Sequence, residues 1–186
     1  LGGMRNKIPA YASTVTLENS IIYGNVRDVE TGSPVAGDTY SVMTLVGAGL
    51  LWVGSREGLY RFDGRSVLRF VPSPDDPGAI SDNSIRTVFQ DSSGRLWIGT
   101  NTGGLNRLDP GARSFTHLRS DSARPDTLSH DSVYAMTEDS AGALWVGTQV
   151  GLNRIVDGRL ERVPFDPEHP QGPGQEYVTV LMADSE

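Results

Sequence analysis

The sequence contains no cysteine, and no apolar run approaches the ~18 residues that a membrane-spanning helix needs. Disulfide bonds and thiol chemistry are therefore excluded, and we expect no membrane span in these residues. The first few residues lack the apolar core of a signal peptide. The 16 Lys and Arg residues form no dense run and the net charge is −7, so the composition argues against a nucleic-acid partner.

Residues with catalytic or metal-binding chemistry are also scarce. The three histidines, His117, His130 and His169, share no spacing typical of metal ligands, and each has polar neighbours that predict a surface position. The sequence has neither a Gly-x-Ser-x-Gly elbow nor a glycine-rich loop that binds phosphate. We therefore expect no metal, no cofactor and no catalytic residue in this chain.

What the sequence does contain is one phrase repeated three times. It reads Leu-Trp-Val-Gly-Ser at residues 51–55, Leu-Trp-Ile-Gly-Thr at 96–100 and Leu-Trp-Val-Gly-Thr at 144–148. All three tryptophans of the protein lie in this phrase. A repeat period of about 45 residues with one Trp in each unit is typical of a β-propeller.

Each repeat unit reads as four short antiparallel strands. In the second unit, residues 84–90, 96–100, 105–108 and 114–118 alternate or are largely apolar, and turn-forming residues separate them. We predict an all-β protein: a partial β-propeller with three four-stranded blades and the first strand of a fourth. The expected blades are residues 39–80, 81–128 and 129–175, with the next beginning at 176–186.

The tryptophans are expected to have a structural role. Trp52, Trp97 and Trp145 lie in strands that are apolar on both faces, as expected where a blade packs between two neighbours. We interpret them as wedges between blades, each with its N–H bonded to a nearby carbonyl.

The turns before the tryptophans share an Asp-x-x-Gly pattern. Asp91 with Gly94, and Asp139 with Gly142, predict turns in which the Asp side chain accepts local backbone N–H groups. One carboxylate in each turn falls short of the six to eight oxygens that calcium needs, so no metal site is expected there.

The extended motif Asp-x-x-Gly-x-Leu-Trp-Val/Ile-Gly-Thr-x-x-Gly-Leu-x-Arg-Leu/Phe-Asp resembles the two-component regulator propeller repeat. It occurs at residues 91–109 with one extra Gly and at 139–157 in a slightly degraded form, and linkers of Leu-Ser-x-Asn/Asp-Ser-Val/Ile type occur at 80–85 and 128–133. The resemblance, which covers residues 39–186, implies the extracytoplasmic sensor of a bacterial receptor, and many such receptors are thought to sense oligosaccharides. Their outputs, histidine kinases or diguanylate cyclases, are not visible here, so we assign no catalysis to this chain.

The sequence stops where the turn of the fourth unit begins, and three blades are too few to close a propeller. We therefore interpret the chain as a piece of a longer protein. Its open blade edges are expected to meet the remaining blades or a second copy of the chain.

Residues 1–38 do not fit the repeat. Residues 2–6 and 15–25 resemble one coil of a right-handed parallel β-helix, whereas residues 24–32 resemble a fragment of a carboxypeptidase-regulatory-like sandwich. An irregular lead-in is the third interpretation.

The best candidates for ligand binding are polar residues in the loops that follow the Trp strands. Loops on a rigid scaffold are where binding residues usually lie. These loops carry Arg56, Glu57, Asn101, Thr102 and Gln149, whose side chains suit the hydroxyl groups of an oligosaccharide. Ordinary hairpin loops in water are the alternative.

Two other functions remain open. The Asp-x-x-Gly-x-x-Trp motif is similar to a sialidase Asp-box and suggests a glycan hydrolase or lyase, although a true Asp-box has Asp-x-Gly spacing. The adjacent carboxylates Asp75 and Asp76 lie between prolines, where we expect a solvated turn rather than a catalytic pair. The other alternative is a structural array that binds proteins.

Overall fold

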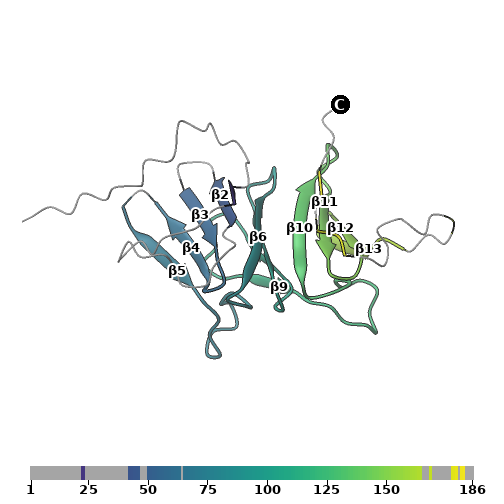
Figure 1. Ribbon diagram of the computed structural model, residues 1–186, viewed down its shortest axis with the longest axis horizontal. Helices are drawn as coiled ribbons and strands as arrows, with labels where there is room; N and C mark the ends of the chain where they lie inside the picture. Colours follow the sequence, from purple (N-terminus) through teal and green to yellow (C-terminus); the bar gives the residue numbers. More distant parts are fainter. Residues whose placement is uncertain are drawn as a thin grey trace, which may run out of the picture.

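A computed structural model of the protein shows antiparallel sheets, and the residues that it describes include no helix (Figure 1). The described residues are 22–23, 42–46, 50–63, 65–164, 168, 177–179 and 181–182, with only the backbone described in the first two ranges. Within this described part, the chain forms no long apolar helix of the kind that crosses a membrane.

Three sheets follow one another along the chain, and each consists of consecutive strands paired with their sequence neighbours. The first sheet contains β1 (Ile22–Tyr23), β2 (Val42–Val46), β3 (Leu50–Gly54), β4 (Leu59–Phe62) and β5 (Val67–Phe70). The second contains β6 (Ile85–Gln90), β7 (Leu96–Thr100), β8 (Leu105–Leu108) and β9 (Thr116–Leu118). The third contains β10 (Val133–Glu138), β11 (Leu144–Thr148), β12 (Leu152–Val156) and β13 (Arg159–Arg162).

The sheets are arranged as successive blades. The first strands of the repeat, β2, β6 and β10, pack against one another on the inner side, and β5, β9 and β13 form the outer edges (Figure 1). The described sheets do not close into a ring. The predicted all-β, partial propeller is therefore confirmed.

In the second and third sheets, the turn between the first two strands depends on one Asp and one Gly. Gly94 and its counterpart in the third sheet both have φ near +79°, a left-handed conformation that Gly adopts at little cost. The carboxylate of Asp91 accepts the backbone N–H groups of Ser93 at 3.1 Å and of Arg95 at 2.9 Å. The Asp side chain thus accepts backbone N–H groups of its own turn.

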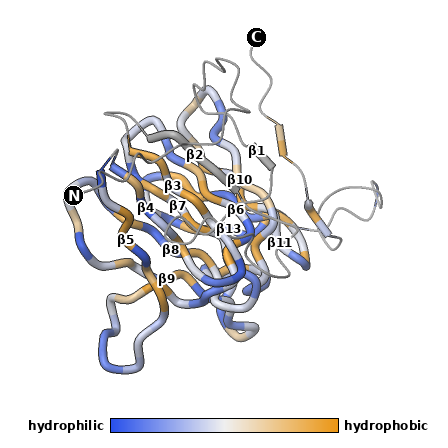
Figure 2. The backbone as a smooth tube through the Cα atoms, turned by 60° about the vertical axis from the view of Figure 1, so that its left-hand side comes forward, coloured by the Kyte–Doolittle hydropathy of each residue, from blue (hydrophilic) through white to orange (hydrophobic). Residues whose placement is uncertain are grey.

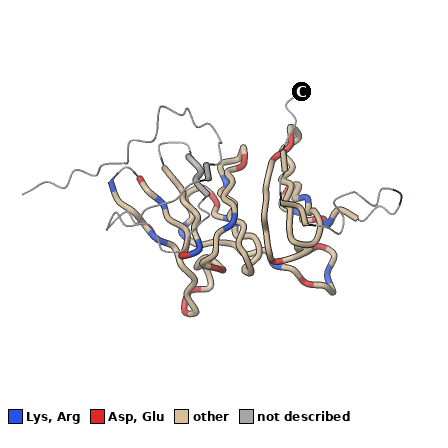
Figure 3. The backbone as a smooth tube through the Cα atoms, in the orientation of Figure 1, with Lys and Arg blue, Asp and Glu red and all other residues tan. Residues whose placement is uncertain are grey.

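The core lies between neighbouring blades. Trp52 of β3 packs with Ile85 and Val88 of the second sheet, and Trp97 of β7 packs with Val133 and Met136 of the third. Figure 2 shows hydrophobic residues concentrated in the strands where the sheets face each other. Charged residues lie mostly on loops and outer strands (Figure 3). Both tryptophans thus pack in the core between two blades.

The Trp N–H groups were predicted to bond to carbonyl groups, and this prediction was wrong, because their acceptors are carboxylates. Trp97 donates its indole N–H to the Oδ2 atom of Asp91 at 2.7 Å, and Trp145 donates to Oδ2 of Asp139 at the same distance. A carboxylate held by the turn six residues earlier is a stronger acceptor than a carbonyl, and it lies within reach of the indole because the turn precedes the Trp strand.

Neighbouring blades pack most closely at the glycine of the repeated phrase. The three pairs of facing residues are Gly54 with Ile85, Gly99 with Val133, and Gly147 with Val178. A Cβ atom on Gly99 would lie 2.6 Å from Cγ1 of Val133 and 2.6 Å from Cγ2 of Thr87. The close approach of two blades therefore requires glycine at this position. The repeated phrase thus supplies both a strand of the blade and the glycine that lets the next blade pack against it.

Few residues near the two ends of the chain are described in the structure. Most of residues 1–38 lie outside the described part, where the β-helix, sandwich and lead-in interpretations stay untested, but Ile22–Tyr23 pairs antiparallel with β2. Near the expected fourth blade, Val178 donates its N–H to the carbonyl of Thr148 at 3.0 Å. The described residues around it form no strand ladder of their own.

Candidate functional site

The loops after the Trp strands lie beside the starting points of the inner strands. Backbone N–H groups of Asn101 and Gln149 donate to the carbonyls of Ser84 and Ser132, both at 2.9 Å. The blade-connecting loops reach the same end, which lies at the bottom of Figure 1. Loops from different parts of the repeat thus form one end of the blade array.

Two buried asparagines hold the blade-connecting loops in place. Asn106 accepts the N–H of Ser81 at 2.9 Å and donates to its Oγ at 2.7 Å. Asn153 makes the same pair of bonds to Ser129, both at 2.8 Å. Both asparagines have 0% exposure, so each bond is shielded from water and the loop position is well specified.

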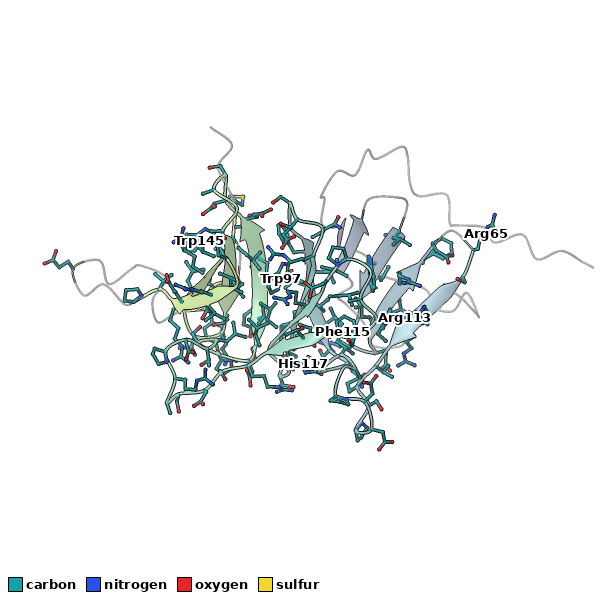
Figure 4. The ribbon with its side chains drawn as sticks, turned by 180° about the vertical axis from the view of Figure 1, so that it is seen from behind. Arg65, Trp97, Arg113, Phe115, His117 and Trp145 are labelled. Carbon is teal, nitrogen blue, oxygen red and sulfur yellow. The ribbon has the colours of Figure 1, made fainter. Side chains whose placement is uncertain are left out.

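The outer strands add a second attachment at equivalent positions. His117 of β9 bonds through Nε2 to the carbonyl of Ala79 at 2.8 Å (labelled in Figure 4), and Arg162 of β13 donates to the carbonyls of Thr127 and Leu128 at 2.8 and 2.9 Å. These contacts make the loop end a rigid platform.

The other histidines have different surroundings. His130 is half-buried, and its Nδ1 accepts the N–H of Ser132 at 3.0 Å, replacing a carboxylate found in the preceding blade. His169 lies outside the described residues.

That carboxylate belongs to Asp82, which fixes the loop carrying Thr102. Its Oδ2 accepts both the N–H of Thr102 at 2.7 Å and the hydroxyl of Thr102 at 2.8 Å, and its Oδ1 accepts the N–H of Ser84 at 3.0 Å. Partial burial disfavours the charged form of Asp82, but the hydrogen bonds from Ser84 and Thr102 outweigh it and lower its pKa. Asp82 thus remains an anion that shapes the loop.

Bulges aim two side chains toward this end. The pairing of β6 with β7 shifts between Ile85 and Thr87, and the pairing of β10 with β11 shifts between Val133 and Ala135. Bulges of this kind redirect a side chain and are frequent next to functional sites. The bulged residues here are Arg86 and Tyr134.

Arg86 and Tyr134 begin a row of side chains that continues to Tyr177. The Arg86 guanidinium lies over the Tyr134 ring, 4.5 Å from its centroid, and the rings of Tyr134 and Tyr177 are 6.1 Å apart. Arg86 donates from Nε to Oδ1 of Asn101 at 2.9 Å and also from Nη2 to the same oxygen. Gln149 donates from Nε2 to the Tyr177 hydroxyl at 3.0 Å. We call Arg86, Asn101, Tyr134, Gln149 and Tyr177 the loop-end row.

Ser132 joins the two halves of this row. Its hydroxyl donates to the carbonyl of Asn101, and its own carbonyl accepts the N–H of Gln149. Ser132 is buried, whereas Arg86 is exposed and Tyr177 is 62% exposed. The row therefore has a buried hydrogen-bonded base and an accessible outer surface.

The structure thus brings together two of the five residues selected from the sequence, Asn101 and Gln149. Thr102 lies next to Asn101 but is engaged by Asp82. Arg56 is exposed, and Glu57 turns toward β5, where its carbonyl accepts two bonds from Arg69 at 3.2 and 2.5 Å.

Sequence reasoning missed three members of the row, Arg86, Tyr134 and Tyr177. The sequence carried no signal for Arg86 or Tyr134, because β6 reads Ile-Arg-Thr-Val-Phe-Gln and β10 reads Val-Tyr-Ala-Met-Thr-Glu, so the two strands differ at every position. Tyr177 carried no signal either.

The Asp-x-x-Gly turns lie at the opposite end of the strands from the loop-end row. Asp91 is 4% exposed, and its Oδ2 accepts from Arg95 at 2.6 Å as well as from Trp97. In Asp139, the Trp145 N–H, followed by the backbone N–H of Ala143, lowers the carboxyl pKa below its usual range. Both carboxylates are committed to the turn. No metal-binding cluster of acidic or histidine side chains occurs among the described residues.

A shallow depression lies on the outer side of the same loops. It has a volume of about 370 Å³ and is lined by residues including His117, Arg124 and Leu160. Its Arg124 already pairs with Asp126 at 2.8 Å. The Arg124 side chain is therefore already engaged within the depression.

Comparison with known proteins supports the repeat identified from the sequence. Residues 79–102 and 127–149 match the family described as "two component regulator propeller". These two segments, which begin the second and third repeats of a partial β-propeller, therefore match the two-component regulator propeller repeat. No curated protein matches the chain significantly in sequence.

Several solved structures share the fold. The extracellular domain of a proposed hybrid two-component system from B. thetaiotaomicron superposes with a TM-score of 0.63 and 24% identity, over 72% of this chain. The chain covers only 19% of that domain. A catalytically inactive virginiamycin B lyase from Staphylococcus aureus matches at a TM-score of 0.48 and 16% identity, over 78% of this chain and 45% of the lyase.

Proposed function

We propose that the chain is part of the extracytoplasmic sensor of a signal-transduction receptor, and that it binds an oligosaccharide at the loop-end row without catalysing a reaction. The sensory part of this proposal is supported by the family of the repeat and by the fold shared with an extracellular domain of a two-component system. The ligand part is supported by the row itself.

One observation carries the choice of ligand: the partly exposed rings of Tyr134 and Tyr177 are neighbours in the middle of the row, and an amide side chain lies at each end of it. Tyrosine offers a flat apolar face and a polar hydroxyl, which suit the C–H face and the hydroxyl groups of a sugar ring. Asn101 and Gln149 add donors and acceptors in fixed positions. An open row extending over neighbouring blades fits a chain of sugars better than a compact ligand.

The hydrolase or lyase alternative has less support. Its motif residues, Asp91 and Asp139, are held by the indole N–H groups of the following tryptophans. A general acid or base has to reach the substrate, and these carboxylates instead serve their own turns.

Titration calorimetry of the full-length protein against a panel of plant, fungal and host oligosaccharides tests this function. We expect one group of related glycans to bind, with affinity lost in Tyr134→Ala and retained in Tyr60→Ala, a matched tyrosine on β4 outside the row. Binding of another ligand class with no response to any glycan would overturn the carbohydrate assignment. Turnover of a bound glycan would overturn the non-catalytic one.

A further inference from the structure

The charge of Arg86 sets it apart from the other residues of the row. Some exposed arginines have a carboxylate partner, as Arg69 does 3.7 Å from Glu57 and Arg124 does 2.8 Å from Asp126, whereas the exposed Arg113 forms no ion pair with the described residues. Arg86 forms no ion pair with any carboxylate among the described residues. Its positive charge remains unneutralised there in a chain whose net charge is −7.

The guanidinium of Arg86 is nevertheless held in one orientation. Asn101 accepts from Nε and Nη2, and the Tyr134 ring supports the guanidinium plane at 4.5 Å. Arginine has five N–H donors, so three of them have no acceptor among the described side chains. A fixed, accessible guanidinium with free donors is suited to bind a carboxylate or a sulfate.

We propose that the ligand of the loop-end row is an acidic oligosaccharide whose anionic group binds Arg86 while a neighbouring sugar ring packs on Tyr134 and Tyr177. This inference rests on the proposed function and specifies the class of glycan. The carboxylate of a uronic acid and the sulfate ester of a sulfated sugar share the required chemistry, a compact anion with several acceptor oxygens.

Matched pairs of probes separate charge from sugar shape. The first pair is trigalacturonate and its methyl ester, and the second is a sulfated κ-carrageenan tetrasaccharide and its desulfated form. Titration calorimetry of the full-length protein at low and at high salt measures affinity for each. We expect one acidic member to bind at least tenfold more tightly than its neutral partner, with an advantage that shrinks as salt screens the charges.

Variants of Arg86 locate this preference. Arg86→Gln should remove the tenfold advantage of the acidic probe over its neutral partner, and Arg86→Lys should retain only part of that advantage, because an ammonium lacks the planar fork. Arg113→Gln, at an exposed position in the turn before β9, is the control and should behave as the wild type. Circular dichroism spectra and melting temperatures of all variants check that the fold is retained.

The outcomes distinguish the inference from the proposed function. If neutral glycans bind as well as acidic ones and lose affinity in Tyr134→Ala, the acidic ligand class is wrong and the sugar site stands. If acidic glycans bind but Arg86→Gln has no effect, Arg86 is not the recognising cation. If no glycan of either charge binds, both proposals fail.

Discussion

Trp97 donates its indole N–H to the carboxylate of Asp91, six residues earlier, at 2.7 Å, and this bond links the turn of a blade to the wedge that packs on the next blade. The same relationship recurs between Trp145 and Asp139. The first unit has Val46 six residues before Trp52, and a valine side chain cannot accept a hydrogen bond from the indole N–H. The Asp-x-x-Gly-x-x-Trp spacing is thus a structural device of the second and third blades.

Removing the carboxylate of Asp91 should destabilise the protein. Asp91→Ala leaves the N–H groups of Trp97, Ser93 and Arg95 without their acceptor in a site that is 4% exposed. We expect a loss of about 2–3 kcal/mol in the free energy of unfolding, measured by urea denaturation. Asp126→Ala, on an exposed loop, is the control and should change stability by less than ~0.5 kcal/mol. Equal effects of the two changes would contradict this account.

A methyl group at Gly99 should push two blades apart. The Cβ atom of Gly99→Ala would overlap Val133 and Thr87, and overpacking of this kind costs about 1–3 kcal/mol. In the double variant with Val133→Ala, part of the added cost should disappear, because one of the two overlapping groups has been removed. Simple additivity of the two changes in unfolding free energy would show that Gly99 and Val133 do not share this contact.

The buried amide of Asn106 should contribute to stability by holding the blade-connecting loop in place. Asn106→Ala leaves both the N–H and the hydroxyl of Ser81 without a partner, at an expected cost of about 2 kcal/mol. Asn83→Ala, at an exposed position of the same blade-connecting loop, serves as the matched control. Hydrogen exchange of the loop should accelerate only in the Asn106 variant, and unchanged exchange would refute the attachment.

The hydrogen bond from Trp145 should be visible in the titration of Asp139. Because this bond lowers the pKa in the folded state, the carboxylate stabilises the fold above its ordinary pKa of 3.8, and the contribution is lost as pH falls through the lower folded value. Trp145→Phe removes the largest cause and should raise the pKa of Asp139. Carboxyl ¹³C NMR titration of both proteins measures this, and identical curves would contradict the assignment.

Much of the architecture could be predicted because it repeats. Hydrophobic alternation and turn residues located the strands of the second and third blades, and the Trp spacing indicated the propeller. The Asp91 acceptor for Trp97 was missed because six-residue spacing across a turn says little about which atoms meet. Gly99 was recognised as part of a motif, but the reason that no larger residue fits there is its contact with Val133, which belongs to another blade.

The candidate site was less accessible to sequence reasoning. Asn101 and Gln149 were found because they lie in loops, where binding residues gather. Arg86 and Tyr134 lie within strands, and only the bulges turn them toward the loop end. A bulge depends on how two strands pair. The alternation of polar and apolar residues along one strand therefore does not reveal it.

Hydrogen exchange with and without the tightest-binding glycan tests the central claim most directly, because it locates the ligand on the fold. The account predicts slower exchange at the starts of β6 and β10 and in the loops at residues 101–104 and 149–151. It predicts no change at the Asp-x-x-Gly turns of residues 91–94 and 139–142. Protection confined to those turns or to the outer strands would contradict the assignment of the loop-end row as the sensing surface.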